Sequence, residues 1–271
     1  MKKLAVFGNP IHQSKSPLIH QLFAQQFDMS IDYQPILGDL DNFEQQVRQF
    51  FTQTNAIGVN VTSPFKSRAK SLADSSSENV ESCNAANTLM LKNNKLHAYN
   101  TDGQGLVADL QRLDMPVKDA KIALIGAGGA ARGVIMPLLS AGVKKLYVIN
   151  RTLSSAQQLI KDLGAPENLT LYEEEKFDGQ VDLVINATSS SLQQQLPNIE
   201  LCRFKACEAV YDMVYLQKPT VFMDYFKQQG CRLRADGLGM LVGQAAHSFN
   251  IWFGEFPSFT PVLQALKAAK V

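Results

Sequence analysis

The sequence contains 271 residues, of which 26 are Lys or Arg and 25 are Asp or Glu, and 45% are hydrophobic. Because one domain usually takes about 100 to 200 residues, this length predicts two domains, or one large one, with a substantial core. A formal net charge of +1 provides no strong field for nucleic acids or anionic membranes, so neither is expected as a partner.

The apolar segments are too short or too interrupted for export or membrane insertion. After Met1-Lys2-Lys3, the first apolar run ends at Asn9-Pro10, which makes it shorter than a signal-peptide core. The longest apolar region, residues 122–143, is broken by glycines, by Arg132 and by Pro137. We therefore expect a cytoplasmic protein without a membrane span.

The cysteines and histidines form no metal-binding pattern. Cys83, Cys202, Cys207 and Cys231 include no Cys-x-x-Cys pair, and the four histidines are not at ligand spacing. We expect buried or inert thiols and no metal site.

The first hundred residues alternate between strand-like and helix-like patterns. In chain order they predict a strand at 4–7, a helix at 17–27, a strand at 33–36, a helix at 40–51 and a strand at 58–61. Residues 88–91 and 96–99 then resemble a hairpin, because Lys92-Asn93-Asn94-Lys95 between them tolerates turn conformations. A helix at about 103–113 would lead out of this α/β domain.

From residue 121 onward, β-branched runs alternate with amphipathic stretches in the rhythm of βαβ units. Strands are predicted at 122–125, 146–149, 181–185 and 209–211, with helices near 130–141, 154–163 and 219–229. Two more helices, from about 240 to 252 and at 261–269, have no strand after them and must pack on an existing sheet.

The predicted fold class is therefore α/β with two domains. Residues 1–101 would form an N-terminal substrate domain, completed by about 238–271, whose helices return to it. Residues 102–237 would form a Rossmann-type domain with a doubly wound parallel sheet.

The strongest single motif directly follows the predicted strand at 122–125. Gly126-Ala127-Gly128-Gly129-Ala130-Ala131 matches G-x-G-x-x-[G/A] in the strand–turn–helix context of dinucleotide-binding folds. Gly126 allows the tight turn, Gly128 lets the backbone approach a pyrophosphate, and Ala131 permits close helix–strand packing. The alternative is a glycine-rich helix start that binds nothing.

The end of the next strand discriminates between cofactors. A carboxylate there would bind the ribose 2′-hydroxyl of NAD, but the sequence is Asn150-Arg151-Thr152. Arg151 can pair with a 2′-phosphate and stack on the adenine, so we predict NADP(H) as the cofactor. The alternative is a solvated charge at a strand end.

A hydride-transfer cofactor leaves a proton to be handled, and two segments offer ionisable groups for it. Asn60-Val61-Thr62-Ser63-Pro64-Phe65-Lys66 follows the strand at 58–61, at the sheet edge where open α/β sheets bind ligands. Asn100-Thr101-Asp102-Gly103 places Asp102 between the hairpin and a helix. Taken alone, Asp102 also fits a helix N-cap and Lys66 a surface lysine.

Two further segments have both a structural and a ligand-binding interpretation. Ser16-Pro17 fits a helix N-cap followed by proline, but the hydroxyls of Ser14-Lys15-Ser16 could hold a ligand carboxylate at that helix N-terminus. Gln244 is polar on an otherwise apolar helix, which suits either a buried hydrogen bond or contact with a ligand hydroxyl.

Taken together, these segments resemble the shikimate dehydrogenase family in order and spacing over nearly the whole chain. The matching segments are Gly8-Asn9-Pro10, Ser14-Lys15-Ser16-Pro17, Asn60-Val61-Thr62-x-Pro64-Phe65-Lys66, Asn87-Thr88, Asn100-Thr101-Asp102-Gly103, the glycine loop, Asn150-Arg151-Thr152, Asn186-Ala187-Thr188-Ser189, Tyr211-Asp212-Met213-Val214-Tyr215 and Asp236-Gly237-x-Gly239-Met240. The resemblance implies an oxidoreductase for the reversible, NADPH-dependent reduction of 3-dehydroshikimate to shikimate, in the biosynthesis of chorismate and aromatic amino acids.

The resemblance also implies residue roles. Ser14 and Ser16 would bind the substrate carboxylate, and the ring hydroxyls and neighbouring groups would be held by Asn60, Thr62, Lys66, Asn87, Asp102, Tyr215 and Gln244. Lys66 and Asp102 would be the catalytic pair. Cofactor contacts would come from Glu78, from Gly126, Ala127, Gly128, Gly129 and Ala130, from Asn150, Arg151, Thr152 and Ser155, and on the nicotinamide side from Thr188, Met213 and Gly237.

The pairing of Lys66 with Asp102 agrees with the chemistry of a ketone reduction. A neighbouring carboxylate favours a charged lysine, which can protonate the alkoxide that hydride arrival creates. Which of the two residues transfers the proton stays open.

Two positions depart from the family pattern. Family members commonly carry a second basic residue three positions after Asn-Arg-Thr, where this chain has Ser155, so we expect a weaker preference for NADP. Ser191 stands where the Asn-Ala-Thr-Ser segment usually continues to a glycine, and a backbone with positive φ would be strained at a serine.

Two alternative functions remain. A quinate/shikimate dehydrogenase with relaxed cofactor use would share the fold, whereas a non-enzymatic dinucleotide-binding sensor would need neither Lys66 nor Asp102. The sequence leaves a monomer and a homodimer equally open.

Overall fold

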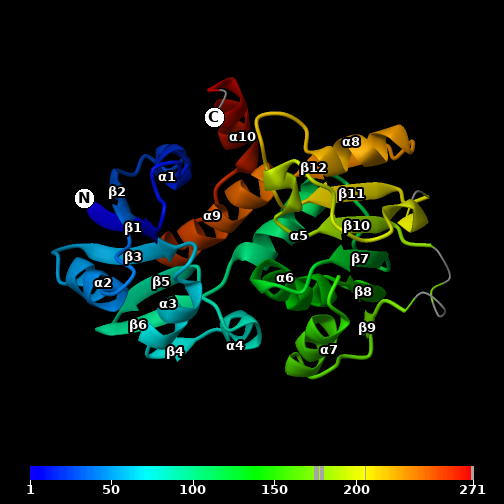
Figure 1. Ribbon diagram of the computed structural model, residues 1–271. Coiled ribbons are helices and arrows are strands. Elements are labelled where there is room, and N and C mark those ends of the chain that lie inside the picture. The colour runs from blue at the N-terminus through cyan, green and yellow to red at the C-terminus, as the bar shows by residue number, and fades with distance from the viewer. Residues whose placement is uncertain (174–176, 178–179, 205, 270–271) are drawn as a thin grey trace. The chain divides into compact units, whose positions relative to one another are not determined.

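The computed structural model of the chain divides into two compact units (Figure 1). Met1–Gly105 and Val242–Val271 form the first unit, and Leu106–Leu241 form the second. The structure describes residues 1–173, 177, 180–204 and 206–269. Both units combine helices with a sheet, so the predicted α/β fold class is confirmed.

The first unit is built on a six-stranded mixed sheet. Its strand order is β2 (Ile31–Leu37), β1 (Lys2–Gly8), β3 (Ala56–Val61), β5 (Thr88–Lys92), β6 (Lys95–Tyr99) and β4 (Ser75–Ser76). Strand β1 is parallel to β2 and β3, whereas β5 is antiparallel to both β3 and β6. The helices of this unit are α1 (Ser16–Gln25), α2 (Phe43–Phe51), α3 (Lys66–Leu72), α4 (Glu78–Cys83) and α10 (Phe259–Ala268), with the beginning of α5 (Asp102–Arg112) and most of α9 (Leu238–Phe253).

A cluster of phenylalanines anchors α2 and the start of α3 to the sheet. Phe43 of α2 is fully buried and stacks on Phe65 with ring centroids 4.4 Å apart, while Phe7 of β1 meets Phe43 edge-on. Because Phe65 immediately precedes α3, this packing determines where Lys66, the first residue of that helix, lies.

The hairpin between β5 and β6 forms as the sequence predicts. Asn93 and Asn94 have φ values of 53° and 59°, which a two-residue turn between twisted antiparallel strands requires. Asparagine tolerates this left-handed conformation better than most residues do.

The indole of Trp252 holds α9 against the sheet of the first unit. Its Nε1 donates to the Leu89 carbonyl at 3.1 Å, and the ring covers Gly58 of β3, where any side chain would overlap it. The C-terminal helices therefore complete this unit.

The second unit contains a parallel, doubly wound sheet. Every neighbouring pair is parallel in the order β12 (Leu233–Asp236), β11 (Ala209–Asp212), β10 (Leu183–Asn186), β7 (Lys121–Ile125), β8 (Lys145–Ile149) and β9 (Leu169–Leu171). Counted from β7 in chain order this is 3-2-1-4-5-6, the Rossmann arrangement with its switch point between β7 and β10. The sheet is covered by α6 (Gly129–Ser140), α7 (Leu153–Asp162) and α8 (Val221–Gln228), accompanied by the short 3-10 turns η2 (Ser190–Gln193) and η3 (Leu201–Phe204).

The sequence patterns missed the shortest elements. These are α3 and α4 in the first unit, and the edge strands β4, β9 and β12 with the two 3-10 turns. Elements of two to seven residues are too short to show a hydrophobic period.

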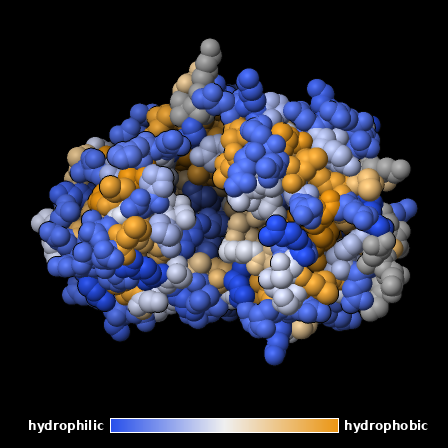
Figure 2. Space-filling model, in the orientation of Figure 1, coloured by the Kyte–Doolittle hydropathy of each residue, from blue (hydrophilic) through white to orange (hydrophobic). Residues whose placement is uncertain are grey.

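Side chains of different polarity are mixed over the surface. On the face that Figure 2 shows, hydrophilic residues predominate, with hydrophobic residues in patches among them. Within the described part of the chain, no helix is both long and apolar enough to cross a membrane. Of the four free cysteines, Cys83, Cys207 and Cys231 are buried and Cys202 is exposed.

Candidate functional site

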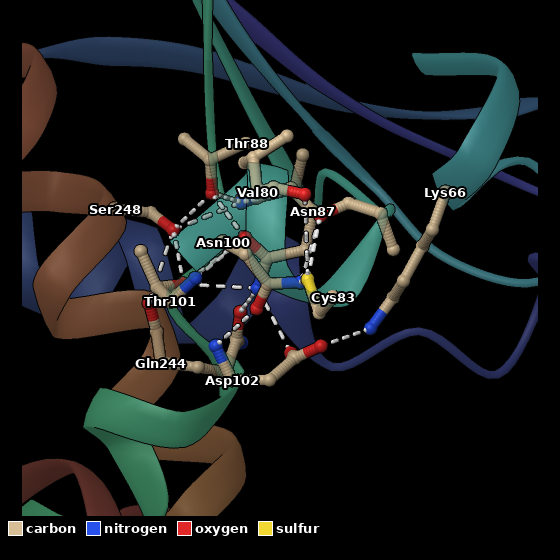
Figure 3. Close-up of polar contacts among 12 residues, drawn as sticks. Lys66, Val80, Cys83, Asn87, Thr88, Asn100, Thr101, Asp102, Gln244 and Ser248 are labelled. Carbon is tan, nitrogen blue, oxygen red and sulfur yellow. Dashed lines mark hydrogen bonds and ion pairs between the residues drawn. The ribbon is translucent and has the colours of Figure 1, made fainter. Parts of the chain in front are cut away.

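Lys66 and Asp102 form an ion pair in the first unit (Figure 3). Each is the first residue of a helix, α3 and α5 respectively, and Lys66 Nζ donates to Asp102 Oδ2. The two side chains are 32% and 21% exposed. Both side chains of the pair are therefore partly in contact with solvent.

Asn87 orients the carboxylate of this pair. Its Nδ2 donates to Asp102 Oδ1 at 2.8 Å, so the two oxygens of Asp102 face different partners. Asn87 is 2% exposed, its Oδ1 accepts a hydrogen bond from the Thr101 backbone N at 3.0 Å, and the Thr101 hydroxyl oxygen lies 3.2 Å from the same atom. A buried carboxamide with its hydrogen bonds made on both ends is rotationally fixed.

Asn100 supports the backbone at the beginning of α5. Its Oδ1 accepts from the Asp102 backbone N at 3.0 Å, and its Nδ2 donates to the Ala85 carbonyl at 3.0 Å and to Cys83 Sγ at 3.2 Å. Asn100 is thus the residue whose side chain caps this turn, while the Asp102 carboxylate faces Lys66 and Asn87. In the sequence, Asn100 stands out only as part of the Asn100-Thr101-Asp102-Gly103 motif.

Gln244 of α9 lies beside Asn87. Its Oε1 is 3.3 Å from Asn87 Nδ2, and its backbone carbonyl accepts from the Thr101 hydroxyl at 2.9 Å. Helices α5 and α9 approach this closely because Gly105 and Gly243 face each other's backbones without side chains. The structure therefore brings together four residues that the sequence offers as candidates for one site: Lys66, Asp102, Asn87 and Gln244.

Asn60 lies deeper, inside a buried polar network. Its Nδ2 donates to Thr88 Oγ1 at 3.1 Å and to Ser248 Oγ at 3.0 Å. Its Oδ1 accepts from the Tyr33 hydroxyl at 2.7 Å and is 3.1 Å from His20 Nε2. Asn60 is 5% exposed, so these contacts occupy its amide within the protein, and its predicted contact with a substrate stays a prediction.

His20 belongs to this network and was not found by sequence analysis. Its ring is fully buried, stacks on Tyr33 at 4.5 Å and lies 5.3 Å from the Trp252 ring. Among the described residues, its Nδ1 has no hydrogen-bond partner. Burial lowers the pKa of His20 to about 3, opposed by the hydrogen bond to Asn60. A polar residue on the apolar face of α1 was the only available sequence signal.

Ser14 and Ser16 lie at the beginning of α1. Ser16 is its first residue, but no side chain caps the helix, so the N-cap interpretation of Ser16 is wrong. The Ser16 backbone N instead donates to Ser14 Oγ at 3.4 Å. Thr62 follows β3 and is held through its backbone N, which donates to the Phe7 carbonyl at 2.9 Å.

The glycine loop of the second unit connects β7 to α6. Gly126 has a φ of +118°, which L side chains rarely adopt, and its backbone N donates to the Ile149 carbonyl at 2.7 Å. A Cβ added at Gly128 or Gly129 would meet nothing, so open space surrounds the helix N-terminus here, which Ala127 and Ala130 flank. This is the shape that a pyrophosphate requires.

A cavity of about 340 Å³ is lined by Ile125, the last residue of β7, and by segments that follow β8 and β10. Asn150, Arg151 and Thr152 line one part of it, and Thr188, Gln193 and Gln195 are among the residues that line another. Asn150 Nδ2 donates to the Thr152 carbonyl at 2.8 Å, which shapes the strand end. Arg151 is exposed, and so is Ser155 in the first turn of α7.

The remaining predicted residues divide between the two units. Thr188, Met213, Gly237 and Tyr215 belong to the second, and burial raises the pKa of the Tyr215 hydroxyl with help from the nearby Asp236 carboxylate. Glu78 is an exposed residue at the start of α4 in the first unit.

The backbone strain that a positive φ would cause at Ser191 does not occur. Its φ is not positive; the residue lies in the 3-10 turn η2, and its hydroxyl donates to Asp212 Oδ2 at 2.6 Å. The chain avoids the left-handed conformation here and uses the serine as a hydrogen-bond donor.

A parallel 3-2-1-4-5-6 sheet with a glycine loop after its first strand and Arg151 after its second defines a dinucleotide-binding protein. Three family models match the chain. They describe the shikimate dehydrogenase substrate binding domain at residues 6–89, shikimate / quinate 5-dehydrogenase at 109–202, and the shikimate 5'-dehydrogenase C-terminal domain at 237–267.

Whole-chain relatives agree with these matches. A protein from Legionella pneumophila (strain Lens) named shikimate dehydrogenase (NADP(+)) is 46% identical over 272 residues, 99% of each chain. One of the same name from Acinetobacter baumannii (strain SDF) is 45% identical, over 97% of this chain and 99% of its own. This chain belongs to the shikimate dehydrogenase family.

Solved structures show the same fold. An Ael1 enzyme from Pseudomonas putida superposes with a TM-score of 0.93 at 40% identity, covering 98% of both chains. Shikimate 5-dehydrogenase from Thermus thermophilus, solved in complex with NADP(H) and shikimate, gives a TM-score of 0.87 at 28% identity over 100% of both chains.

The buried His20 makes folding stability depend on pH. Its folded pKa is below its usual value, so the unfolded chain takes up the proton first. The stability that the neutral ring contributes is complete above about pH 6.5 and is lost as the pH falls toward 3. In urea unfolding at several pH values, we expect the free energy of unfolding to fall below pH 6 by up to about 1.4 kcal/mol per pH unit more than in His20→Gln. Parallel curves for the two proteins would contradict a neutral His20.

Proposed function

We propose that this protein catalyses the reversible, NADPH-dependent reduction of 3-dehydroshikimate to shikimate. The observation that carries the proposal is the partly exposed Lys66–Asp102 ion pair, which Asn87 orients. A proton donor with a fixed carboxylate is what reduction of a ketone to an alcohol needs besides a hydride. The names of the relatives at about 45% identity supply the substrate class.

The second unit suits NADP(H). The open helix N-terminus at Gly128 and Gly129 would accommodate the pyrophosphate, and Arg151 would pair with the 2′-phosphate. Asn150, Thr152 and Ser155 would complete the adenosine side, and Thr188, Met213 and Gly237 the nicotinamide side. When bound, the cofactor supplies a hydride to the ketone carbon.

Lys66 then completes the reduction. Hydride arrival leaves negative charge on the former ketone oxygen, and the Nζ ammonium donates a proton to it. The Asp102 carboxylate accepts a hydrogen bond from Nζ and so orients the ammonium before the transfer. Because both side chains are partly exposed, the proton can be replaced from solvent, and the reverse reaction returns it by the same route.

The substrate would be held by groups around this pair. Asn87 and Gln244 offer amide groups beside Asp102, and Ser14 and Ser16 offer hydroxyls for the carboxylate at the N-terminus of α1. Asn60 donates hydrogen bonds to Thr88 and Ser248 in the buried network, so its contribution to substrate binding would be indirect. Thr62, Tyr215 and Glu78 are assigned their roles by resemblance alone. A cytoplasmic location remains the expectation from the short apolar segments, and the protein would act as a monomer or a homodimer.

Initial rates test the assignment directly. Reduction of NADP⁺ or NAD⁺ is followed at 340 nm with shikimate or quinate as the alcohol, in all four combinations. We expect the highest kcat/KM with shikimate and NADP⁺. Comparable rates with quinate or NAD⁺ would instead indicate a quinate/shikimate dehydrogenase with relaxed cofactor use, and binding of NADPH without any turnover would indicate a sensor.

Lys66→Ala should lower kcat with little change in KM, because its ammonium matters most when charge develops on the oxygen. The loss of a positioned proton donor is about 10²- to 10⁴-fold. Lys70→Ala is the matched control, since Lys70 lies one turn later on α3 and pairs with Glu81 at 2.9 Å. Steady-state kinetics of both variants decide the matter; an unchanged kcat in Lys66→Ala would exclude the role.

Arg151→Ser should reduce kcat/KM for NADP⁺ by about 10- to 100-fold, which corresponds to the loss of charged hydrogen bonds to a phosphate. The value for NAD⁺ should change little, since NAD⁺ has no 2′-phosphate. Lys145→Ala removes a cation from the opposite end of the same strand β8 and serves as the control. Equal losses with both cofactors would show that Arg151 does not recognise the 2′-phosphate.

A further inference from the structure

Asp212 is a fully buried carboxylate at the C-terminal end of β11. Its Oδ1 accepts from Asn186 Nδ2 at 3.0 Å and from the Val214 backbone N at 3.1 Å, and its Oδ2 accepts from the Ser191 hydroxyl at 2.6 Å. The side chain of Thr220, which caps α8, also donates to it. All four donors are neutral groups of the second unit.

These hydrogen bonds connect the backbone segments that follow β10 and β11. Asn186, which Asp212 orients, accepts through its own Oδ1 from the backbone N and the hydroxyl of Thr188, at 3.0 and 2.7 Å. The Met213 backbone N donates to the Asn186 carbonyl at 2.9 Å. Thr188 and Met213 therefore each depend on a residue that Asp212 holds.

The same group of contacts extends to the end of β12. The Gly237 backbone N donates to the Val214 carbonyl at 3.2 Å, and the Met213 carbonyl occupies the space that a side chain at Gly237 would need. Thr188, Met213 and Gly237 come from three separate segments of the chain. One buried carboxylate lies at the centre of the hydrogen bonds that join these segments.

We propose that Asp212 is the positioning residue of the nicotinamide side of the cofactor site, and that Ser191 completes its hydrogen bonding in this chain. The proposal rests on the proposed function, which assigns Thr188, Met213 and Gly237 to the nicotinamide. Asp212 and Ser191 need not touch the cofactor; they act by holding these three residues in place.

The four donors explain why a carboxylate is required. An ionised carboxylate only accepts hydrogen bonds, whereas the amide of an asparagine would direct an NH₂ group at one pair of these donors. Burial raises the pKa of the Asp212 carboxyl, and the hydrogen bonds from Ser191, Thr220, Val214 and Asn186 oppose that rise. Removing one donor therefore weakens the interaction that keeps the segments together.

Three single variants test the proposal in the full-length protein. Ser191→Ala removes one hydrogen-bond donor to Asp212. Asp212→Asn replaces one acceptor oxygen of the carboxylate with an NH₂ group, which is a donor. Val210→Ala is the matched control, because Val210 is buried on β11 two residues before Asp212, on the same face of the strand, and makes apolar contacts only in the cluster around Phe222. It lowers stability without changing the hydrogen bonds of Asp212.

The readouts are the Kd of NADPH, measured by its fluorescence, the KM values for NADP⁺ and shikimate, and the Tm. For Ser191→Ala we expect the Kd and the KM for NADP⁺ to rise about fivefold, as the loss of one hydrogen bond predicts, and the KM for shikimate to change less than twofold. A folded Asp212→Asn should exceed this effect, and Val210→Ala should lower the Tm with a Kd within twofold of the wild type.

Two results would overturn the proposal. One is an unchanged Kd of NADPH in Ser191→Ala, and the other is an increase in Val210→Ala that equals the increase in Ser191→Ala, which would make the effect one of stability alone. Because NADPH binding is measured without turnover, these results are separate from a failure of the wild type to oxidise shikimate, which would reject the proposed function instead.

Discussion

The arrangement of the candidate catalytic residues depends on the hydrogen bonds of one buried carboxamide, that of Asn87. Its backbone immediately precedes β5 and is bonded to the sheet, because its carbonyl accepts from the Val61 backbone N and its N–H donates to the Tyr99 carbonyl. The side chain is therefore aimed by the sheet itself, and through Nδ2 it directs the carboxylate of Asp102. Leaving such a group without partners in the interior costs about 1–3 kcal/mol, so the contacts around it form together or not at all. The position of the Asp102 carboxylate follows from this constraint, while the packing of Phe65 on Phe43 places Lys66 at the beginning of α3.

The second unit uses the same principle with a different group. Asp212 lies at the end of a central strand, as Asn87 lies at the edge of β5, and its buried oxygens hold segments that are themselves partly exposed. In each unit, a buried polar residue, Asn87 or Asp212, holds its neighbours in place through hydrogen bonds. The residues proposed to bind ligands are among these neighbours or contact them. Such residues occur at strand ends because the backbone leaves the sheet there, and its N–H and C=O groups then need side chains as hydrogen-bond partners.

The two sheets were predictable because their strands are apolar and their connections carry strong local signals. The glycine loop, the Asn93-Asn94 turn and the strand at 122–125 each depend on residues adjacent in sequence, and the structure has all of them. Lys66 and Asp102 became candidates for a similar reason, since each follows a strand within a few residues, and the structure pairs their side chains. The contacts of Asn60 could not be found this way. Tyr33, Thr88 and Ser248 are distant in sequence, and only the packed sheet and α9 bring them to one amide.

Ser191 shows a second limit of prediction from sequence. Its φ angle depends on the conformation that the segment adopts in this chain, and not on which residue related sequences carry at that position.

The partial exposure of Lys66 and Asp102 is consistent with a catalytic rather than a structural purpose. A fully buried ion pair would lose hydration that its mutual attraction barely restores, and an exposed pair contributes only about 0–1 kcal/mol to stability. At 32% and 21% exposure, this pair is not placed to stabilise the fold to a large extent. It keeps contact with solvent, through which the proton of the proposed reaction would be replaced. The fold gains its stability from the aromatic and aliphatic cores around it, and its buried amides hold the pair in position. Stability and the proposed chemistry are thus assigned to different residues.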